Sequence, residues 1–200
     1  MARAAARDAD RCPGIGARLR RLDERLLLVA RTRCHSPEAE RAVARFSALG
    51  EHGALWLAVG LAGQLLDGRR RSAWRAATGA VAGAYALNTA IKPLVGRRRP
   101  ELPGLPALTP TPTDLSFPSA HAATSFAGAV AYARLGLPRA PLFGLAAALS
   151  FSRVYLGVHH PSDVLAGAVL GSSLGFWATR SAPARAAAAG GASADGNAPA

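Results

Sequence analysis

The chain has 200 residues, of which 24 are Lys or Arg and 12 are Asp or Glu, giving a formal net charge of +12. A length of this order corresponds to one domain. Half of the residues are hydrophobic and only 18% are charged, whereas average soluble domains carry about 25% charged residues. A basic disordered chain is therefore excluded for most of the length. Arginine supplies 23 of the 24 cations, and the single lysine is Lys92.

The N-terminal quarter is rich in arginine and begins with a segment, residues 1–14, that we expect to be flexible. Acids and arginines interrupt it before any apolar stretch, so no cleavable signal sequence is expected. From Ile15 to Arg33, leucines and a valine recur at helical spacing opposite arginines, which predicts a basic amphipathic region over residues 15–50. Two interpretations stay open: a helix in the headgroup layer of an anionic membrane, or a solvated packing helix.

Five charge-free stretches rich in Ala, Gly, Leu and Val follow: Gly53 to Leu66, Ala76 to Ile91, Ala122 to Ala133, Ala140 to Ser152 and Val164 to Thr179. Each is shorter than the roughly 20 residues of a membrane span, but reaches that length if flanking polar residues lie in the interface. The alternative is a soluble bundle of buried, alanine-rich helices.

Two features favour the membrane. The stretches lack the polar stripe that a soluble helix shows to water, and small residues recur at the close spacing that membrane helices use for packing, namely Gly79, Gly83, Gly167 and Gly171. We therefore predict an all-α, multi-pass transmembrane bundle of about five spans over residues 51–180, in the cell membrane. The Ala- and Gly-rich tail, residues 181–200, is expected to be disordered.

Polar residues gather where these stretches end, in three groups. The first runs from Lys92 to Pro100, the second from Pro118 to His121 and the third from Ser152 to Asp163. If five helices alternate in direction, all three groups lie on one face of the membrane. The sequence therefore predicts that they form a single site.

The residue types in this site favour phosphate chemistry. The cations Lys92, Arg99 and Arg153 outnumber the carboxylates, which favours an anion with several oxygens, and phosphate matches the guanidinium fork. Backbone N–H groups at the helix start near Ser119 would add a second anion-binding element. A histidine beside a carboxylate suits an activated nucleophile, and a second histidine can protonate a leaving group.

The order K-x6-R-P, P-S-x-H and S-R-x5-H-x3-D, between Lys92 and Asp163, resembles the three-part signature of the type 2 phosphatidic acid phosphatase family. The resemblance implies an integral-membrane phosphatase that needs no metal or cofactor and hydrolyses a phosphate monoester through a phosphohistidine. It implies that His159 is the nucleophile, that Asp163 orients it and that His121 donates a proton. The implied phosphate ligands are Lys92, Arg99, Ser119, Ala120 through its backbone N–H, and Arg153.

One position departs from the family pattern, because Ala120 stands where the family usually has glycine. Alanine fits without strain if this residue lies in the first helical turn, and would distort the anion site if the backbone there is left-handed. His160 is interpreted as a capping residue of the last helix. Arg97 and Arg98 are interpreted as loop charges that meet lipid headgroups, with the alternative that one of them helps to bind the substrate.

Two further histidines and a proline-rich stretch lie outside the predicted site. His35 and His52 are interpreted as solvated or interfacial. The proline-rich stretch between Pro100 and Pro118 predicts a non-helical loop, either a plain connection or a lid that accepts a lipid chain.

The resemblance implies a lipid phosphate as substrate. A weaker similarity of Arg45 to Gly53 to small actinobacterial family members favours a polyprenyl-linked one, but phosphatidic acid, phosphatidylglycerol phosphate and polyprenyl diphosphate stay open. Two other functions also stay open: a vanadate-dependent haloperoxidase in which His159 holds vanadate, and a non-catalytic membrane protein that binds anionic lipid. No nucleic acid is expected as a partner. The sequence does not fix the oligomeric state or the membrane face of the site.

Overall fold

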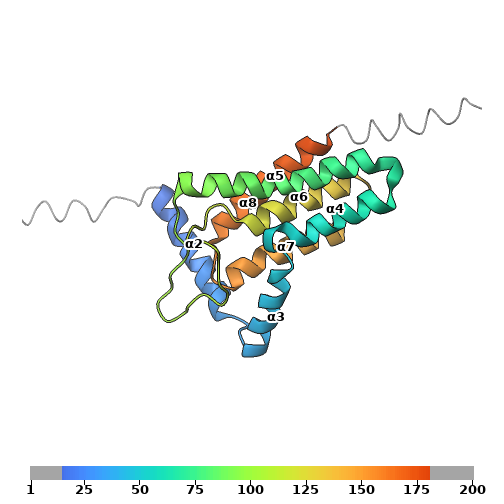
Figure 1. The fold of residues 1–200 in the computed structure, drawn as a ribbon. Helices are drawn as coiled ribbons and strands as arrows, with labels where there is room; N and C mark the ends of the chain where they lie inside the picture. The colour runs from blue at the N-terminus through green and yellow to red at the C-terminus, as the bar shows by residue number, and fades with distance from the viewer. Residues whose placement is uncertain (1–14, 181–200) are drawn as a thin grey trace, which may run out of the picture.

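The computed structural model describes residues 15–180, and in this range the protein is helical, with isolated β-bridges and no strand. The helices are α2 (Ile15–Thr32), α3 (Pro37–Ala48), η1 (Glu51–Gly53), α4 (Ala54–Leu66), η2 (Gly68–Arg70), α5 (Arg71–Val95), α6 (Ala120–Arg134), α7 (Arg139–Tyr155) and α8 (Pro161–Thr179). Figure 1 shows α4 to α8 gathered into one bundle with roughly aligned axes. The expectations for residues 1–14 and 181–200 lie outside the described residues.

Each charge-free stretch of the sequence corresponds to one helix of the bundle, except that Gly53 belongs to η1. The second stretch was predicted from Ala76, but α5 begins at Arg71, because arginine is a good helix former and the two arginines there continue the helix. The predicted all-α class is therefore confirmed for the described residues.

Within residues 15–180, no helix is both long enough and apolar enough to meet the usual criterion for a membrane span.

Helix α6 lies at the centre of the bundle and contacts α4, α5, α7 and α8. Its residues are small, and most are buried, including Ala122, Ala123 and Ala127. Trp56 of α4 is also buried, and its indole N–H donates a hydrogen bond of 3.0 Å to the Ser125 hydroxyl. The small side chains of α6 therefore let the surrounding helices approach it on several sides, and α6 carries the second polar group of the sequence at its N-terminal end.

Helix α8 packs against α6 through three glycines spaced four residues apart, Gly167, Gly171 and Gly175. A Cβ on them would lie 2.4, 2.0 and 2.6 Å from the carbonyl oxygens of Ser119, Ala123 and Ala127. The predicted packing role is thus confirmed for Gly167 and Gly171. It was wrong for Gly79 and Gly83, where an added Cβ would meet nothing within 4 Å.

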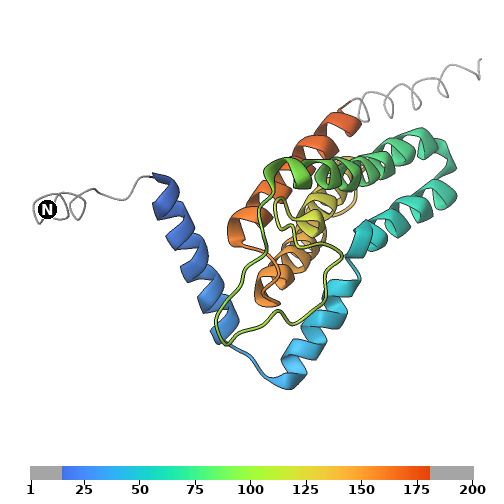
Figure 2. The ribbon, with the colours of Figure 1, turned by 60° about the vertical axis from the view of Figure 1, so that its left-hand side comes forward.

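Helix α2 lies outside the bundle, beside the long loop that connects α5 to α6 (Figure 2). It ends one residue before the predicted boundary, and the predicted region then breaks at Ser36, which is the N-cap of α3. The leucines of the predicted apolar stripe are about half exposed, whereas the buried row of α2 consists of Asp23, Leu27 and Arg31. The face of α2 that packs on the protein is therefore not its leucine face.

The loop between α5 and α6 is non-helical, as the prolines predicted. Its two ends are held side by side by backbone hydrogen bonds, from Arg99 to Asp114 at 3.0 Å and from Ser116 to Arg97 at 2.8 Å. A further bond of 3.0 Å joins Leu108 to Leu156 in the turn after α7. These bonds hold the first polar group against the third.

The close contact between α6 and α8 predicts unequal effects for two glycine substitutions. Gly171→Ala places a methyl group against a backbone carbonyl of α6, so we expect it to lower the free energy of unfolding by about 1–3 kcal/mol. Gly79→Ala fills open space in a helix interior and should stabilise the protein by up to about 1 kcal/mol. Denaturant unfolding in detergent measures both. Equal effects of the two substitutions would contradict the described packing.

Candidate active site

A cavity of about 490 Å³ lies where α5 ends and α6 begins, beside the turn between α7 and α8. Six of the eight sequence-predicted site residues line it: Lys92, Arg99, Ala120, His121, Arg153 and His159. Ser119 and Asp163 are fully buried and do not line the cavity. The three polar groups predicted to meet from topology therefore do meet.

The three cations of the cavity are held by neutral oxygens. The Lys92 ammonium donates to the carbonyls of Leu115 and Pro118, both at 3.1 Å. Arg99 donates from Nε to the Thr113 carbonyl at 2.7 Å and from Nη1 to the Val158 carbonyl at 2.8 Å.

The third cation, Arg153, is buried and donates to the Ser47 hydroxyl at 2.7 Å, and its Nε lacks a hydrogen-bond partner among the described residues. Within residues 15–180, none of the three cations has a carboxylate within salt-bridge distance. Their positive charge is thus left for an anion in the cavity.

The contacts of His159 determine which ring nitrogen carries the proton. Nη1 of Arg99 lies 3.2 Å from Nε2 of His159, and because a guanidinium can only donate, Nε2 must accept through its lone pair. The proton then resides on Nδ1, which lies 3.6 Å from Oδ2 of Asp163. That separation is longer than a hydrogen bond, so in this state the carboxylate faces the ring without bonding to it.

Burial, together with the charges of Arg99 and Arg153, lowers the pKa of His159 to about 4, although Asp163 acts in the opposite direction. The ring is 3% exposed, and a charged imidazolium there would lose most of its hydration. At neutral pH, His159 is therefore an uncharged imidazole whose Nε2 lone pair faces Nη1 of Arg99.

The second polar group forms the start of α6. Ser119 is the N-cap, with φ −74° and ψ 118°, and its hydroxyl accepts a hydrogen bond from the N–H of Ala122. Ala120 is the first residue of α6, and it is absent from the positive-φ residues of the described chain. The first of the two interpretations of Ala120 is therefore correct, and alanine fits there without backbone strain.

His121 is held by the end of α3. Its Nε2 lies 3.1 Å from the Ser47 carbonyl, which can only accept, so Nε2 carries a proton. Gly50 leaves the space that this ring needs, since a Cβ there would lie 2.9 Å from the ring. Ser47 thus contacts His121 through its carbonyl and Arg153 through its hydroxyl.

Sequence reasoning missed the contribution of the α3–α4 junction. Ser47 was not singled out, and His52, interpreted as solvated or interfacial, lines the cavity together with Glu51. His52 also adopts a left-handed backbone, with φ 53°, which is uncommon for a non-glycine residue. A serine and a histidine outside any motif carry no sequence signal for such a role, because only the packing of α3 on α7 brings them to the site.

Arg97 was interpreted as a charge that meets lipid headgroups, and this was wrong. Its guanidinium is part of a buried network and forms salt bridges of 2.8 Å with Asp163 and 2.7 Å with Asp23 of α2. His160, in contrast, is the N-cap of α8 as expected, and its backbone N–H donates to Oδ2 of Asp163 at 2.8 Å.

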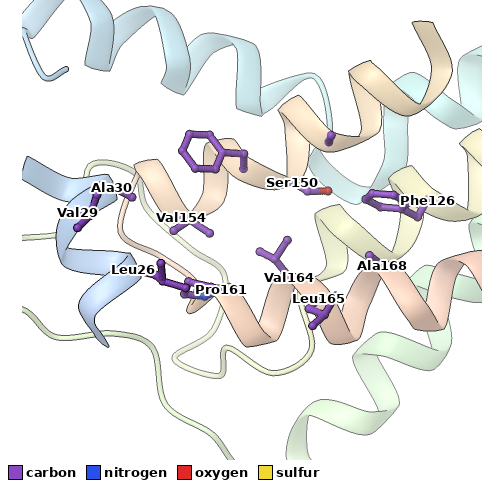
Figure 3. Close-up of a pocket in the computed structure, with 12 residues that line it drawn as sticks. Leu26, Val29, Ala30, Phe126, Ser150, Val154, Pro161, Val164, Leu165 and Ala168 are labelled. Carbon is purple, nitrogen blue, oxygen red and sulfur yellow. The ribbon is translucent and has the colours of Figure 1, made fainter. Parts of the chain in front are cut away.

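A second cavity, of about 510 Å³, is apolar and lies between α2, α6, α7 and α8. Figure 3 shows Leu26 and Val29 of α2 facing Val154 and Pro161 across it. Its lining contains no titratable side chain. This apolar cavity therefore lacks the groups needed for acid–base or phosphate chemistry, which the first cavity contains.

Comparison with known proteins agrees with this geometry. The family model described as PAP2 superfamily matches residues 73–187. The chain belongs to the PAP2 superfamily. It is 42% identical over 130 residues to decaprenylphosphoryl-5-phosphoribose phosphatase of Mycobacterium tuberculosis (strain ATCC 25618 / H37Rv), which covers 64% of this chain and 72% of that protein.

Two solved structures share the fold. LpxE of Aquifex aeolicus superposes with a TM-score of 0.69 at 24% identity, covering 80% of this chain and 95% of that one. The first transmembrane PAP2 type phosphatidylglycerolphosphate phosphatase from Bacillus subtilis gives a TM-score of 0.68 at 24% identity, covering 83% and 87%. The family match and the relatives named as phosphatases show that the protein is an enzyme, a phosphoric monoester hydrolase of the PAP2 superfamily.

The low pKa of His159 predicts the acid limb of this PAP2 phosphatase. The neutral imidazole is the form with a free lone pair, so we expect kcat/KM to fall as the pH drops through about 4. A pH profile of kcat/KM in a buffer series of constant ionic strength measures it. An acid limb near the ordinary histidine pKa would contradict the described burial of His159.

Proposed function

We propose that the protein is a metal-independent, membrane-embedded lipid phosphatase that hydrolyses a polyprenyl-linked phosphate monoester through a phosphohistidine intermediate. One observation carries the proposal: three cations without carboxylate partners converge with a neutral, buried histidine on one cavity. Such a site binds an anion with several oxygens and presents it with a nucleophile.

The reaction follows from the positions of the two histidines. Nε2 of His159 attacks phosphorus, so that a P–N bond forms as the bond from phosphorus to the lipid oxygen breaks. His121 donates a proton to the departing alkoxide. Water then attacks the phosphohistidine: a P–O bond forms as the P–N bond breaks, and His121 takes up the proton of the water, which restores both histidines and releases inorganic phosphate. Asp163 stabilises the charge that develops on the His159 ring.

The cations supply the electrostatic stabilisation. Lys92, Arg99 and Arg153 face the equatorial oxygens of the transferring group, where negative charge is distributed in the transition state. Backbone N–H groups at the start of α6, including that of Ala120, add dipoles of the same sign, and Ser119 holds this helix start in place. A magnesium site would instead require oxygen ligands such as carboxylates, and Glu51 is the one carboxylate that lines the cavity.

Exposed apolar side chains support the membrane location. Large hydrophobic residues of the bundle are more than half exposed, among them Leu61, Leu65, Leu66, Leu165, Val169 and Trp177. Exposed apolar surface of this extent favours contact with lipid. The exposed leucines and arginines of α2 support its position in the headgroup layer, with the active site on the same side.

The lipid assignment rests on the Mycobacterium tuberculosis relative, whose name specifies a decaprenyl-linked phosphoribose. The relatives found for this chain are named as phosphatases, which favours phosphate hydrolysis over vanadate-dependent oxidation. The non-catalytic alternative is excluded by the family assignment together with the intact constellation.

The function is tested by phosphate release from lipid phosphates by the detergent-purified protein. We expect the fastest release from a polyprenylphosphoryl phosphoribose, compared with phosphatidic acid, phosphatidylglycerol phosphate, polyprenyl diphosphate and a soluble ribose phosphate. EDTA should leave the rate unchanged. Loss of activity in EDTA would refute the metal-free mechanism, and equal rates on the soluble ester would refute the lipid assignment.

Substitutions separate the roles of the histidines. His159→Ala removes the nucleophile and should lower kcat on the order of 10⁴-fold or more, whereas His121→Ala should lower it by about 10²- to 10⁴-fold. His160→Ala is the matched control, because His160 is the neighbour of His159 in the sequence. A larger loss in His160→Ala than in His159→Ala would reassign the nucleophile.

A further inference from the structure

Asp163 is fully buried, and both of its carboxylate oxygens are engaged. Oδ1 accepts a hydrogen bond of 2.8 Å from Nη1 of Arg97, and Oδ2 accepts one of 2.8 Å from the backbone N–H of His160. Oδ2 is also the oxygen that faces His159. Arg97 therefore fixes the rotation of the carboxylate that orients the nucleophile.

Arg97 is held in turn by the N-terminal helix. Its Nη2 donates to Oδ2 of Asp23 at 2.7 Å, and its Nη1 also donates to the hydroxyl of Ser162 at 2.6 Å. One guanidinium thus bridges two buried carboxylates with different nitrogens, an arrangement that a lysine ammonium cannot reproduce with the same planar geometry.

Asp23 also caps α8, although it lies on another helix. Its Oδ1 accepts a hydrogen bond of 2.8 Å from the backbone N–H of Ser162, in the first turn of α8, and its Oδ2 accepts one from the Ser162 hydroxyl. N–H groups in the first turn of a helix lack partners within the helix, and a carboxylate there is favoured by the helix dipole. Asp163 accepts the backbone N–H of the N-cap, His160, so the two carboxylates satisfy different N–H groups at the same helix start.

The charge of Asp23 is maintained in the folded protein. Burial alone would raise the pKa of its carboxyl, but hydrogen bonds from Arg97 and Ser162 outweigh burial and lower that pKa. Asp23 is 7% exposed, so the pairing is little screened by solvent. On either side of Asp23, the apolar contacts of α2 leave cavities against α8, which makes this polar network a principal attachment of α2 to the site.

The position of Arg97 separates it from the phosphate-binding cations. Arg97 does not line the cavity that holds Lys92, Arg99 and Arg153, but a cleft beside α2. Its contacts are therefore with the carboxylates of Asp23 and Asp163, and not with the space that the anion would occupy.

We propose that Arg97 is a positioning residue for the catalytic carboxylate, and that Asp23 makes the N-terminal helix α2 part of the active site. This inference rests on the proposed roles of His159 and Asp163. It assigns to α2, beyond any contact with lipid, the task of keeping Asp163 aligned with His159.

The test uses the full-length protein in detergent, with Arg97→Gln, Arg97→Lys and Asp23→Asn. Arg98→Gln is the matched control, because Arg98 is the exposed neighbour of Arg97. Arg97→Gln should lower kcat by about 10- to 100-fold, the usual cost of losing a group that orients a catalytic ligand, with little change in KM. Arg97→Lys should recover part of the loss, and Asp23→Asn should cause a smaller loss of the same kind.

The double variant Asp23→Asn with Arg97→Gln tests whether the two residues act together. We expect it to be no worse than Arg97→Gln alone, because both substitutions disable one network. Additive losses would show that Asp23 acts independently of Arg97.

The titration of His159, followed by NMR, distinguishes positioning from general damage. The titratable and charged groups around His159 and Asp163 are Asp23 and Glu24 of α2, Lys92 of α5, Arg97 and Arg99 of the loop, His121 of α6, Arg153 of α7 and His160. Removing Arg97 takes away one cation and leaves the Asp163 charge unbalanced, and both changes favour the imidazolium. The pKa of His159, and with it the acid limb of kcat/KM, should therefore rise in Arg97→Gln and stay constant in Arg98→Gln.

Three results would overturn the inference: a rise in KM without loss of kcat, activity equal to that of Arg98→Gln, or an unchanged His159 titration. If Arg97→Gln does not fold, the same comparisons of kcat, KM and the His159 titration with Arg98→Gln are made with Arg97→Lys and Asp23→Asn. Absence of phosphatase activity in the unsubstituted protein would refute the proposed function. The His159 titration would still decide whether Arg97 and Asp23 control the histidine.

Discussion

Uncompensated positive charge in one cavity is the constraint on which the rest of the site depends. Lys92, Arg99 and Arg153 are held by backbone carbonyls and a serine hydroxyl, which fix their positions without neutralising them. Neutral acceptors preserve the field that an entering phosphate experiences, whereas carboxylate partners would cancel it. Burial, together with the charges of Arg99 and Arg153, lowers the pKa of His159 and keeps its ring uncharged, as the proposed nucleophile requires.

The fold supplies these acceptors from segments far apart in the chain. The proline-rich loop contributes the carbonyls that hold Lys92, the turn after α7 contributes one for Arg99, and α3 contributes Ser47 for Arg153. The glycine contact between α6 and α8 brings the helix start at Ala120 close to the first turn of α8, where the Ser119 N–H bonds the Asp163 carbonyl at 3.0 Å. The packing of α6 on α8 therefore also determines the geometry of the site.

Much of this could be predicted from the sequence. The positions of the five bundle helices follow from the charge-free stretches, and the meeting of three polar groups follows from alternating helix direction. The packed face of α2 could not be predicted, because its buried row contains an aspartate and an arginine that periodicity assigns to solvent. Arg97 was misassigned for a related reason. In the sequence, Arg97 and Arg98 are equivalent loop arginines, and only the fold brings the carboxylates of Asp163 and Asp23 to Arg97. Asp23 is more than seventy residues away in the sequence.

The central claim is that His159 forms a covalent bond to phosphorus, and the most direct measurement is an attempt to trap that bond. The protein is mixed with a lipid substrate carrying a labelled phosphate monoester, quenched rapidly and digested, and the labelled peptide is sequenced. The account predicts an acid-labile, base-stable label on His159, absent from His159→Ala. Turnover of the same substrate with no label on His159 at any quench time, or with the label on another residue, would contradict it.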